Sequence, residues 1–116
     1  MTSPKRGEIW LVQLDPTVGQ ELQKTRPAIV INSELFAAIP MRIVVPLTSW
    51  QSRFQERPFM VAIKRTHDNG LAQDSAGNLL QVRSLSVERF TIRLGQVSQN
   101  VLQELLAGLV ICVDYE

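Results

Sequence analysis

The sequence has 116 residues, of which 45% are hydrophobic and 20% are charged, with a formal net charge of +1. This composition indicates one soluble globular domain over residues 1–116. A single cysteine excludes an intrachain disulfide and favours a reducing compartment. The polar N-terminal residues are followed by no long apolar run, so we expect no signal peptide, no membrane contact and a cytoplasmic location.

Positive charge is concentrated in the first part of the chain. Residues 1–65 contain nine of the 12 lysines and arginines against five acids, so this part carries +4 and residues 66–116 carry −3. The asymmetry is compatible with a basic face that binds nucleic acid, and equally with a solvated surface whose two halves differ.

Short strand-like segments follow one another along the chain, and a single helix comes last. β-Branched and aromatic residues predict strands at Glu8–Leu14, Ala28–Ile31, Ile43–Val45, Phe59–Ile63, Leu79–Val82 and Phe90–Val97. Only Gln13 interrupts the first run, as in a strand buried on most of both faces. Pro46 is expected to end the third strand, and a short helix is expected over Leu35–Ala38.

After Ser98, apolar residues recur with the spacing of an amphipathic helix as far as Val113. We therefore expect a mainly β fold with a C-terminal helix, in which five or six strands form a small curved barrel or paired sheets.

Two long polar connections interrupt the strands, at Asp15–Pro27 and Thr48–Pro58. Connections of about a dozen residues are long for a compact domain and are usually either functional or disordered. The first one contains Glu21 and the cations Lys24 and Arg26. We interpret it as an active-site loop.

The residue types exclude several kinds of catalytic site. One histidine excludes a two-histidine ribonuclease site within one chain, and one histidine with one cysteine argues against zinc. Carboxylates are scattered, and no phosphate-binding glycine loop or nucleophile elbow is present. The remaining groups suffice for attack of an RNA 2′-OH on its own phosphate. Arg26 would stabilise the phosphorane, and Glu21, if buried, would act as the general base.

Four motifs together resemble the MazF/PemK family of toxins, which are sequence-specific mRNA endoribonucleases of toxin–antitoxin pairs. They are Gly7-Glu8-Ile9-Trp10, Asp15-Pro16-Thr17-x-Gly19-x-Glu21, Lys24-Thr25-Arg26-Pro27-Ala28-Ile29-Val30 and Val45-Pro46-Leu47-Thr48. The resemblance implies an SH3-like small barrel of the CcdB/MazF/PemK type and a homodimer that binds RNA along its interface. It also implies metal-independent cleavage that leaves a 2′,3′-cyclic phosphate and a 5′-OH.

The resemblance implies catalytic roles for Arg26, Glu21 and Thr48, with no metal and no other cofactor. It also implies that Gln81 lies near the substrate. Leu80 stands where the family usually has an aspartate, which leaves open a catalytically degenerate member that binds RNA or antitoxin without cutting.

RNA contacts are expected from both loops and from the segment around Gln81. The candidates are Thr17, Gln20, Lys24, Trp50, Arg53, Phe54, Gln81 and Arg83. Trp50 and Phe54 flank Arg53, a mixture of aromatic and cationic groups by which proteins bind single-stranded RNA. Alternatively, the two rings fold back as hydrophobic anchors.

The expected partners are single-stranded RNA, a cognate antitoxin protein and a second copy of the chain, with DNA reached only through the antitoxin. A rival from another class is a non-enzymatic gyrase poison of the CcdB type on the same barrel. Such proteins resemble this one in fold but use a tryptophan-containing C-terminal tail, whereas this chain ends Val113-Asp114-Tyr115-Glu116.

Overall fold

The computed structural model describes residues 3–16, 18–21 and 24–115. Its strands are β1 (Glu8–Gln13), β2 (Thr25–Val30), β3 (Met41–Ser49), β4 (Met60–Ile63), β5 (Ser75–Asn78), β6 (Arg83–Ser86) and β7 (Phe90–Gln96). Its helices are α1 (Gln99–Cys112) and the short 3₁₀ turns η1 (Glu34–Phe36), η2 (Ser52–Glu56), η3 (Leu79–Gln81) and η4 (Val87–Arg89). The predicted mainly β fold with a C-terminal helix is confirmed.

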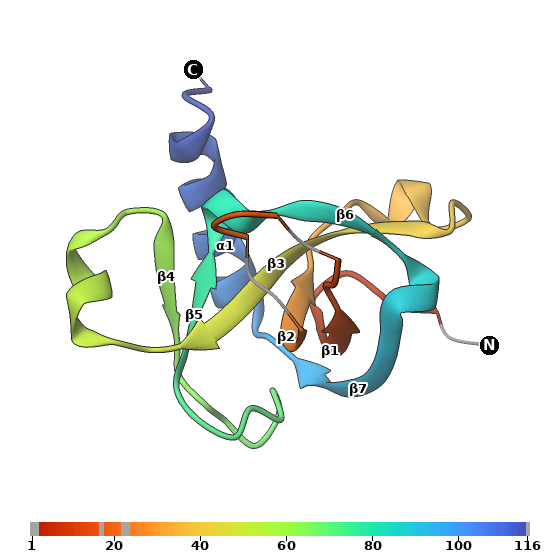
Figure 1. Cartoon of the computed structure of the whole chain (residues 1–116), viewed down its shortest axis with the longest axis horizontal. Coiled ribbons are helices and arrows are strands. Elements are labelled where there is room, and N and C mark those ends of the chain that lie inside the picture. The colour runs from red at the N-terminus through yellow and green to blue at the C-terminus, as the bar shows by residue number, and fades with distance from the viewer. Residues whose placement is uncertain (1–2, 17, 22–23, 116) are drawn as a thin grey trace.

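All strand pairs are antiparallel, and β3 is the strand that joins the two parts of the sheet. The order is β4-β5-β3-β2-β1-β7, and β6 pairs with the first half of β3. The second half of β3 pairs with β5 instead. In Figure 1, β3 therefore crosses the molecule as a long diagonal strand, with β4 and β5 on one side and β1, β2 and β7 on the other.

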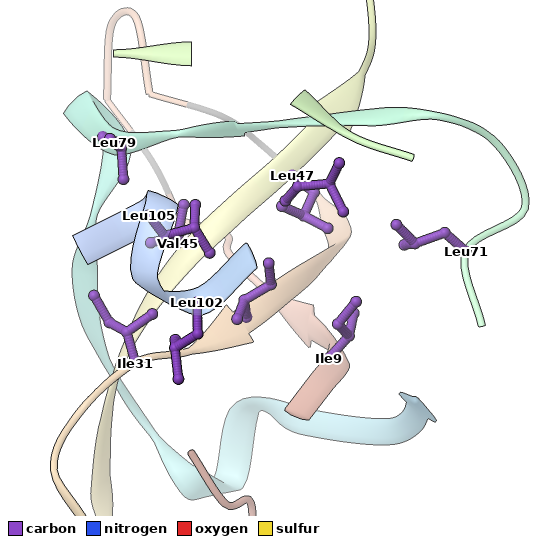
Figure 2. Close-up of a cluster of buried hydrophobic side chains, with 10 residues drawn as sticks. Ile9, Ile31, Val45, Leu47, Leu71, Leu79, Leu102 and Leu105 are labelled. Carbon is purple, nitrogen blue, oxygen red and sulfur yellow. The ribbon is translucent and has the colours of Figure 1, made fainter. Parts of the chain in front are cut away.

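The central strands are buried on both faces. Ile29 and Val45 belong to one apolar cluster, whereas their chain neighbours Val30 and Val44 belong to a second cluster. The first cluster lies between the sheet and α1, where Figure 2 shows Leu102 and Leu105 of the helix beside Val45. Because both faces are covered by protein, these strands carry continuous apolar runs rather than an alternating pattern.

Helix α1 has two halves with different surroundings. Ser98 caps its start by accepting a hydrogen bond from the Val101 amide at 3.2 Å, and Leu102 and Leu105 are buried in the core. Towards its C-terminal end the exposed fractions of Val110, Ile111 and Val113 rise to 40%, 66% and 66%. In Figure 1 this end of the helix projects beyond the strands.

Three details of the predicted elements were wrong. Pro46 does not end β3, because it lies where β3 changes its neighbour on one side from β6 to β5, so its missing amide interrupts no ladder on that side. The strand expected at 79–82 is the 3₁₀ turn η3, and the strand lies just before it, as β5. The short helix expected over 35–38 is the 3₁₀ turn η1, which starts one residue earlier.

A tight turn packs against β7 through two glycines. A side chain on Gly95 would place its Cβ 2.3 Å from the Asp68 carbonyl oxygen, and one on Gly70 would meet the Leu94 carbonyl oxygen. Gly70 also has a φ of 67°, which favours glycine. The turn at residues 68–70 is therefore packed directly on β7, at the edge of the sheet.

Among the described residues, no helix is long and apolar enough to cross a membrane.

Candidate active site

The loop between β1 and β2 is closed at its base by one backbone pair and one hydrogen bond to a carboxylate. The Leu14 amide donates to the Lys24 carbonyl at 3.0 Å, and the Lys24 amide donates to Oδ1 of Asp15 at 3.0 Å. Lys24 has a positive φ of 67°, so the chain turns sharply there before it enters β2. Arg89, from η4, donates to the carbonyls of Gln13 and Asp15. The loop therefore leaves the sheet from an anchored base.

The far part of the loop is a turn that rests against η3. The Glu21 amide donates to the Val18 carbonyl at 3.2 Å, and the Glu21 carboxylate accepts a hydrogen bond from the Val18 amide. Nε2 of Gln81 donates to the Gln20 carbonyl at 3.2 Å, across 61 residues of sequence. This contact brings the loop over the strands next to η3 and β6, as Figure 1 shows.

Arg26 and Thr48 meet where the two parts of the sheet separate. Nη1 of Arg26 is 3.5 Å from Oγ1 of Thr48, and both side chains are half-buried. The last β2–β3 pair before them is Ala28 with Pro46. Beyond that pair, Arg26 is held by its pairing with β1, and Thr48 by its pairing with β5. The contact therefore spans a seam between the two parts of the sheet.

A cavity of about 180 Å³ opens beside this contact. Arg26, Thr48 and Ser49 line it together with Gln73 and Ser75 from the β4–β5 connection and β5. Nε2 of Gln73 donates to Oγ of Ser49, so a side chain of the connection is tied to the end of β3. A guanidinium and several hydroxyl and amide groups thus surround one cavity, which suits a phosphate with its ribose.

The structure joins four of the predicted positions in two separate contacts and leaves Glu21 outside both. Arg26 contacts Thr48, and Gln81 holds the loop through Gln20. Glu21, however, is exposed and bound to its own turn, so the burial that a general base requires is not provided by this chain alone. Lys24 is exposed, and Arg83 donates to the Leu14 carbonyl at 3.4 Å. Thr17 lies outside the described residues.

In the second loop, the burial of Phe54 decides between an RNA-stacking ring and a hydrophobic anchor. Phe54 is only 4% exposed, and Trp50, Arg53 and Arg57 pack around its ring. The prediction that Phe54 stacks on RNA is therefore wrong for this structure, because the ring is a hydrophobic anchor. Trp50 is half-buried and Arg53 is exposed, so both stay candidates for RNA contact.

Sequence reasoning missed the contribution of the β4–β5 connection. Gln73 and Ser75 lie between the strands predicted at 59–63 and 79–82, where no element is predicted, and Ser49 is not among the candidate residues. The pairing of Ser49 with Ser75 joins residues distant in sequence, and no local pattern signals it. Arg89 was missed for the same reason, since its acceptors are more than 70 residues away.

The carboxylate of Glu8, on the strand next to the β7 edge of the sheet, accepts several hydrogen bonds. Burial raises the pKa of Glu8, but hydrogen bonds from Arg93, Trp10 and the Lys5 amide outweigh it, and the pKa is lower than usual. Oε2 of Glu8 lies 2.7 Å from Nε of Arg93. This pair joins β1 to β7 and has a structural role.

No group of three or more potential metal ligands is found within residues 3–16, 18–21 and 24–115.

Residues 5–113 match the family model described as the PemK-like, MazF-like toxin of a type II toxin–antitoxin system. The chain belongs to the PemK/MazF toxin family. Endoribonuclease MazF9 of Mycobacterium tuberculosis is 35% identical to this PemK/MazF toxin over 95% of the chain and 96% of the relative. Endoribonuclease PemK of Escherichia coli is 33% identical over 90% of the chain and 78% of the relative.

Solved structures share the fold of this PemK/MazF toxin. MazF of Deinococcus radiodurans superposes with a TM-score of 0.81 at 22% identity, over 98% of this chain and 99% of the other. A mycobacterial endoribonuclease in complex with its cognate antitoxin superposes with a TM-score of 0.75 at 17% identity, over 97% of each chain. The predicted CcdB/MazF/PemK-type barrel is therefore confirmed.

Proposed function

We propose that this toxin is a metal-independent, sequence-specific endoribonuclease that cleaves single-stranded mRNA. The 2′-oxygen attacks the adjacent phosphorus, the bond from phosphorus to the 5′-oxygen breaks, and the products end in a 2′,3′-cyclic phosphate and a 5′-OH. The substrate supplies the nucleophile, so the protein needs a proton acceptor, a proton donor for the leaving oxygen and a stabiliser of the phosphorane.

The contact between Arg26 and Thr48 carries the proposal. A guanidinium binds two phosphate oxygens at once, and the Thr48 hydroxyl donates to one of them from the same wall of the cavity. Arg26 stays charged throughout the reaction, so it stabilises the negative charge that develops on the phosphorane.

Glu21 supplies the carboxylate that takes the proton of the 2′-OH. It lies on the exposed side of the loop, whose position is set by Gln81, and an RNA strand laid across the loop would cover it. The leaving 5′-oxygen takes its proton from solvent, since Arg26 is a poor proton donor.

Self-association of the toxin would use the C-terminal end of α1. Val110, Ile111, Val113 and Tyr115 are all exposed there, and α1 packs against η3, on which Leu80 is 61% exposed. Because η3 carries Gln81, a second copy bound here would lie beside the loop, and RNA would run along the interface. Ile111→Asp should shift the protein from dimer to monomer in sedimentation, whereas Ile92→Asp, on β7 with 56% exposure against 66% for Ile111, should not.

A cognate antitoxin protein is the further partner, and DNA is reached only through it. The relative solved with its antitoxin supports this partner for the family. The toxin acts on mRNA, so the proposal places it in the cytoplasm.

The test is cleavage of a long RNA by the purified protein in EDTA, with cut sites mapped by primer extension. We expect discrete cuts at one short sequence in the wild type and none with Arg26→Ala. Lys5→Ala, which removes an exposed cation elsewhere, should cut like the wild type.

Full cleavage by Arg26→Ala would overturn the assignment of the site. Binding of RNA without any cleavage by the wild type would instead indicate a degenerate member of the family. Inhibition of gyrase with no effect on RNA would indicate a poison of the CcdB type.

A further inference from the structure

A second cavity, of about 190 Å³, lies beside the candidate active site. Its walls come from the residue after β3, from the end of β4 with the next residue, and from the start of β5 with the residue before it. It is lined by Trp50, Ala62, Ile63, Lys64, Asp74 and Ser75. Sites for drug-sized ligands usually measure about 300–1,000 Å³, so this cavity suits a single ring system. Its composition, with one indole, one cation and one carboxylate around an apolar floor, is that of a site for a heteroaromatic ring.

The two cavities are neighbours along the same strand pair. Ser75 lines both of them, and Ser75 pairs with Ser49. Thr48 and Trp50 are two residues apart, or about 7 Å along an extended chain. An RNA strand with its reacting phosphate at Arg26 and Thr48 would therefore have an adjacent nucleotide at the second cavity.

The indole of Trp50 is held in place without a ligand. Its ring meets Phe54 edge to face, with centroids 5.8 Å apart and planes at 81°. The Trp50 backbone amide donates to the Asp74 carbonyl at 3.0 Å, so the backbone that carries the indole is joined to the wall that contains Asp74. Since neither the ring nor the wall has to be ordered on binding, stacking of a base on this indole costs little conformational entropy.

The two charged groups of the cavity differ in their hydrogen-bonding capacity: Asp74 accepts and Lys64 donates. Oδ1 of Asp74 accepts the Arg65 amide at 2.9 Å, and the carboxylate has further acceptor capacity. Lys64 offers only donors. In the described part of the chain, Lys64 and Asp74 form no ion pair with each other, so both charged groups can face a ligand. The pair is suited to a ring with an amino group on one side and a carbonyl or ring nitrogen on another.

We propose that this cavity is a nucleobase subsite in which Trp50 stacks on a base next to the scissile phosphate and Asp74 accepts from its exocyclic amino group. The inference rests on the proposed function, because the ligand is a nucleotide of the RNA substrate. It assigns base selection at one position: cytosine, whose amino group donates, is preferred to uracil, whose carbonyl at the same place does not.

The experiment measures binding of short homopolymers of cytidine and of uridine to the full-length protein, by fluorescence anisotropy. We expect the wild type to bind the cytidine polymer about tenfold tighter. Asp74→Asn should erase or reverse this ratio, because an amide can donate to the uracil carbonyl. Glu88→Gln, the matched loss of an exposed carboxylate on η4, should leave the ratio unchanged.

Trp50→Ala should weaken binding of both polymers by roughly 5- to 150-fold, the range measured for stacking on aromatic side chains. Trp50→Phe should restore much of this loss, and thermal melts of both variants establish that they are folded. If Trp50→Ala is unfolded, the ratio measured with Asp74→Asn decides alone.

Equal affinity of the wild type for the two polymers, or an unchanged ratio in Asp74→Asn, would overturn the subsite. These outcomes are distinct from failure of the proposed function, which is an absence of RNA cleavage by the wild type. The polymer measurements require binding only, so they are informative whether or not cleavage is found.

Discussion

Substitution of Arg26 and Thr48, singly and together, tests whether their contact is the catalytic one. Arg26→Ala removes the guanidinium, Arg26→Lys keeps a charge but loses the two-pronged geometry, and Thr48→Val removes only the hydroxyl. Both side chains are half-buried at the wall of one cavity, with Nη1 and Oγ1 3.5 Å apart. If they hold the same phosphate, their effects should be coupled.

The expected magnitudes follow from the position of the two groups. The phosphorane carries one more negative charge than the ground state, and two unit charges about 4 Å apart near a protein surface interact by about 4 kcal/mol. Arg26→Ala should therefore slow cleavage by roughly 10²–10³-fold. Arg26→Lys should lie between it and the wild type. Thr48→Val removes one hydrogen bond to a charged group, which corresponds to about 10- to 100-fold.

The assay is single-turnover cleavage of a fluorescent RNA oligonucleotide at saturating protein, so that the rate reports chemistry and not binding. The double variant should be slower than Arg26→Ala by much less than Thr48→Val is slower than the wild type, as expected for groups that act as a unit. Circular dichroism melts of the wild type and all four variants control for folding.

Two results would refute the reasoning. One is an Arg26→Ala rate within about tenfold of the wild type, which is below the loss expected for one oxyanion donor. The other is full additivity of the two substitutions, which would place Thr48 in a separate role.

Three further predictions concern the loop, the packing and the pH dependence. Gln81→Ala removes the hydrogen bond to the Gln20 carbonyl, so kcat/KM should fall about 3- to 10-fold with little change in Tm, and amide exchange in residues 18–21 should speed up; slower exchange would contradict the docking. Gly95→Ala forces a Cβ against the Asp68 carbonyl, so unfolding free energy should drop by about 2 kcal/mol and Tm by about 10 °C in calorimetry; an unchanged Tm would mean that the turn yields freely. The folded pKa of Glu8 is lower than its ordinary value of 4.5, so its contribution to stability is present above that value and is lost as pH falls through the folded pKa. Glu8→Gln should therefore be less stable than the wild type at neutral pH, with the gap closing in acid titrations followed by denaturant unfolding; a constant gap would contradict this.

Local sequence patterns predicted those elements whose apolar residues fall at the positions buried in the core. The first strand, the last strand and α1 all have apolar residues at positions that the core requires, so their types and approximate bounds were predicted correctly. β5 was not, because Ser75–Asn78 contains a glycine and an asparagine, which disfavour strands. It is a strand because β3 and β4 pair with it on either side, and Gly77 leaves room for Leu105 of α1.

For the candidate site, residue chemistry pointed to Arg26 and Glu21, and the family resemblance added Thr48 and Gln81. In the structure Arg26 contacts Thr48 and Gln81 contacts Gln20, and the catalytic roles stay predictions. The second loop differs, since burial of Phe54 depends on how η2 folds back, which composition does not show. The sequence could not predict that Ser49, Gln73 and Asp74 lie close together, because the pairing of β3 with β5 brings them together.

Because Arg26 and Thr48 belong to different parts of the sheet, the distance between their side chains depends on the angle between those parts. One group moves with β1 and β2, and the other with β3 and β5, beyond the last shared pair at Ala28 and Pro46. A small change in the angle between the two parts of the sheet would lengthen or shorten the 3.5 Å contact while each residue kept its place in its own strand. If Arg26 and Thr48 hold the reacting phosphate, a partner protein that widens this angle would inhibit cleavage without contacting either residue.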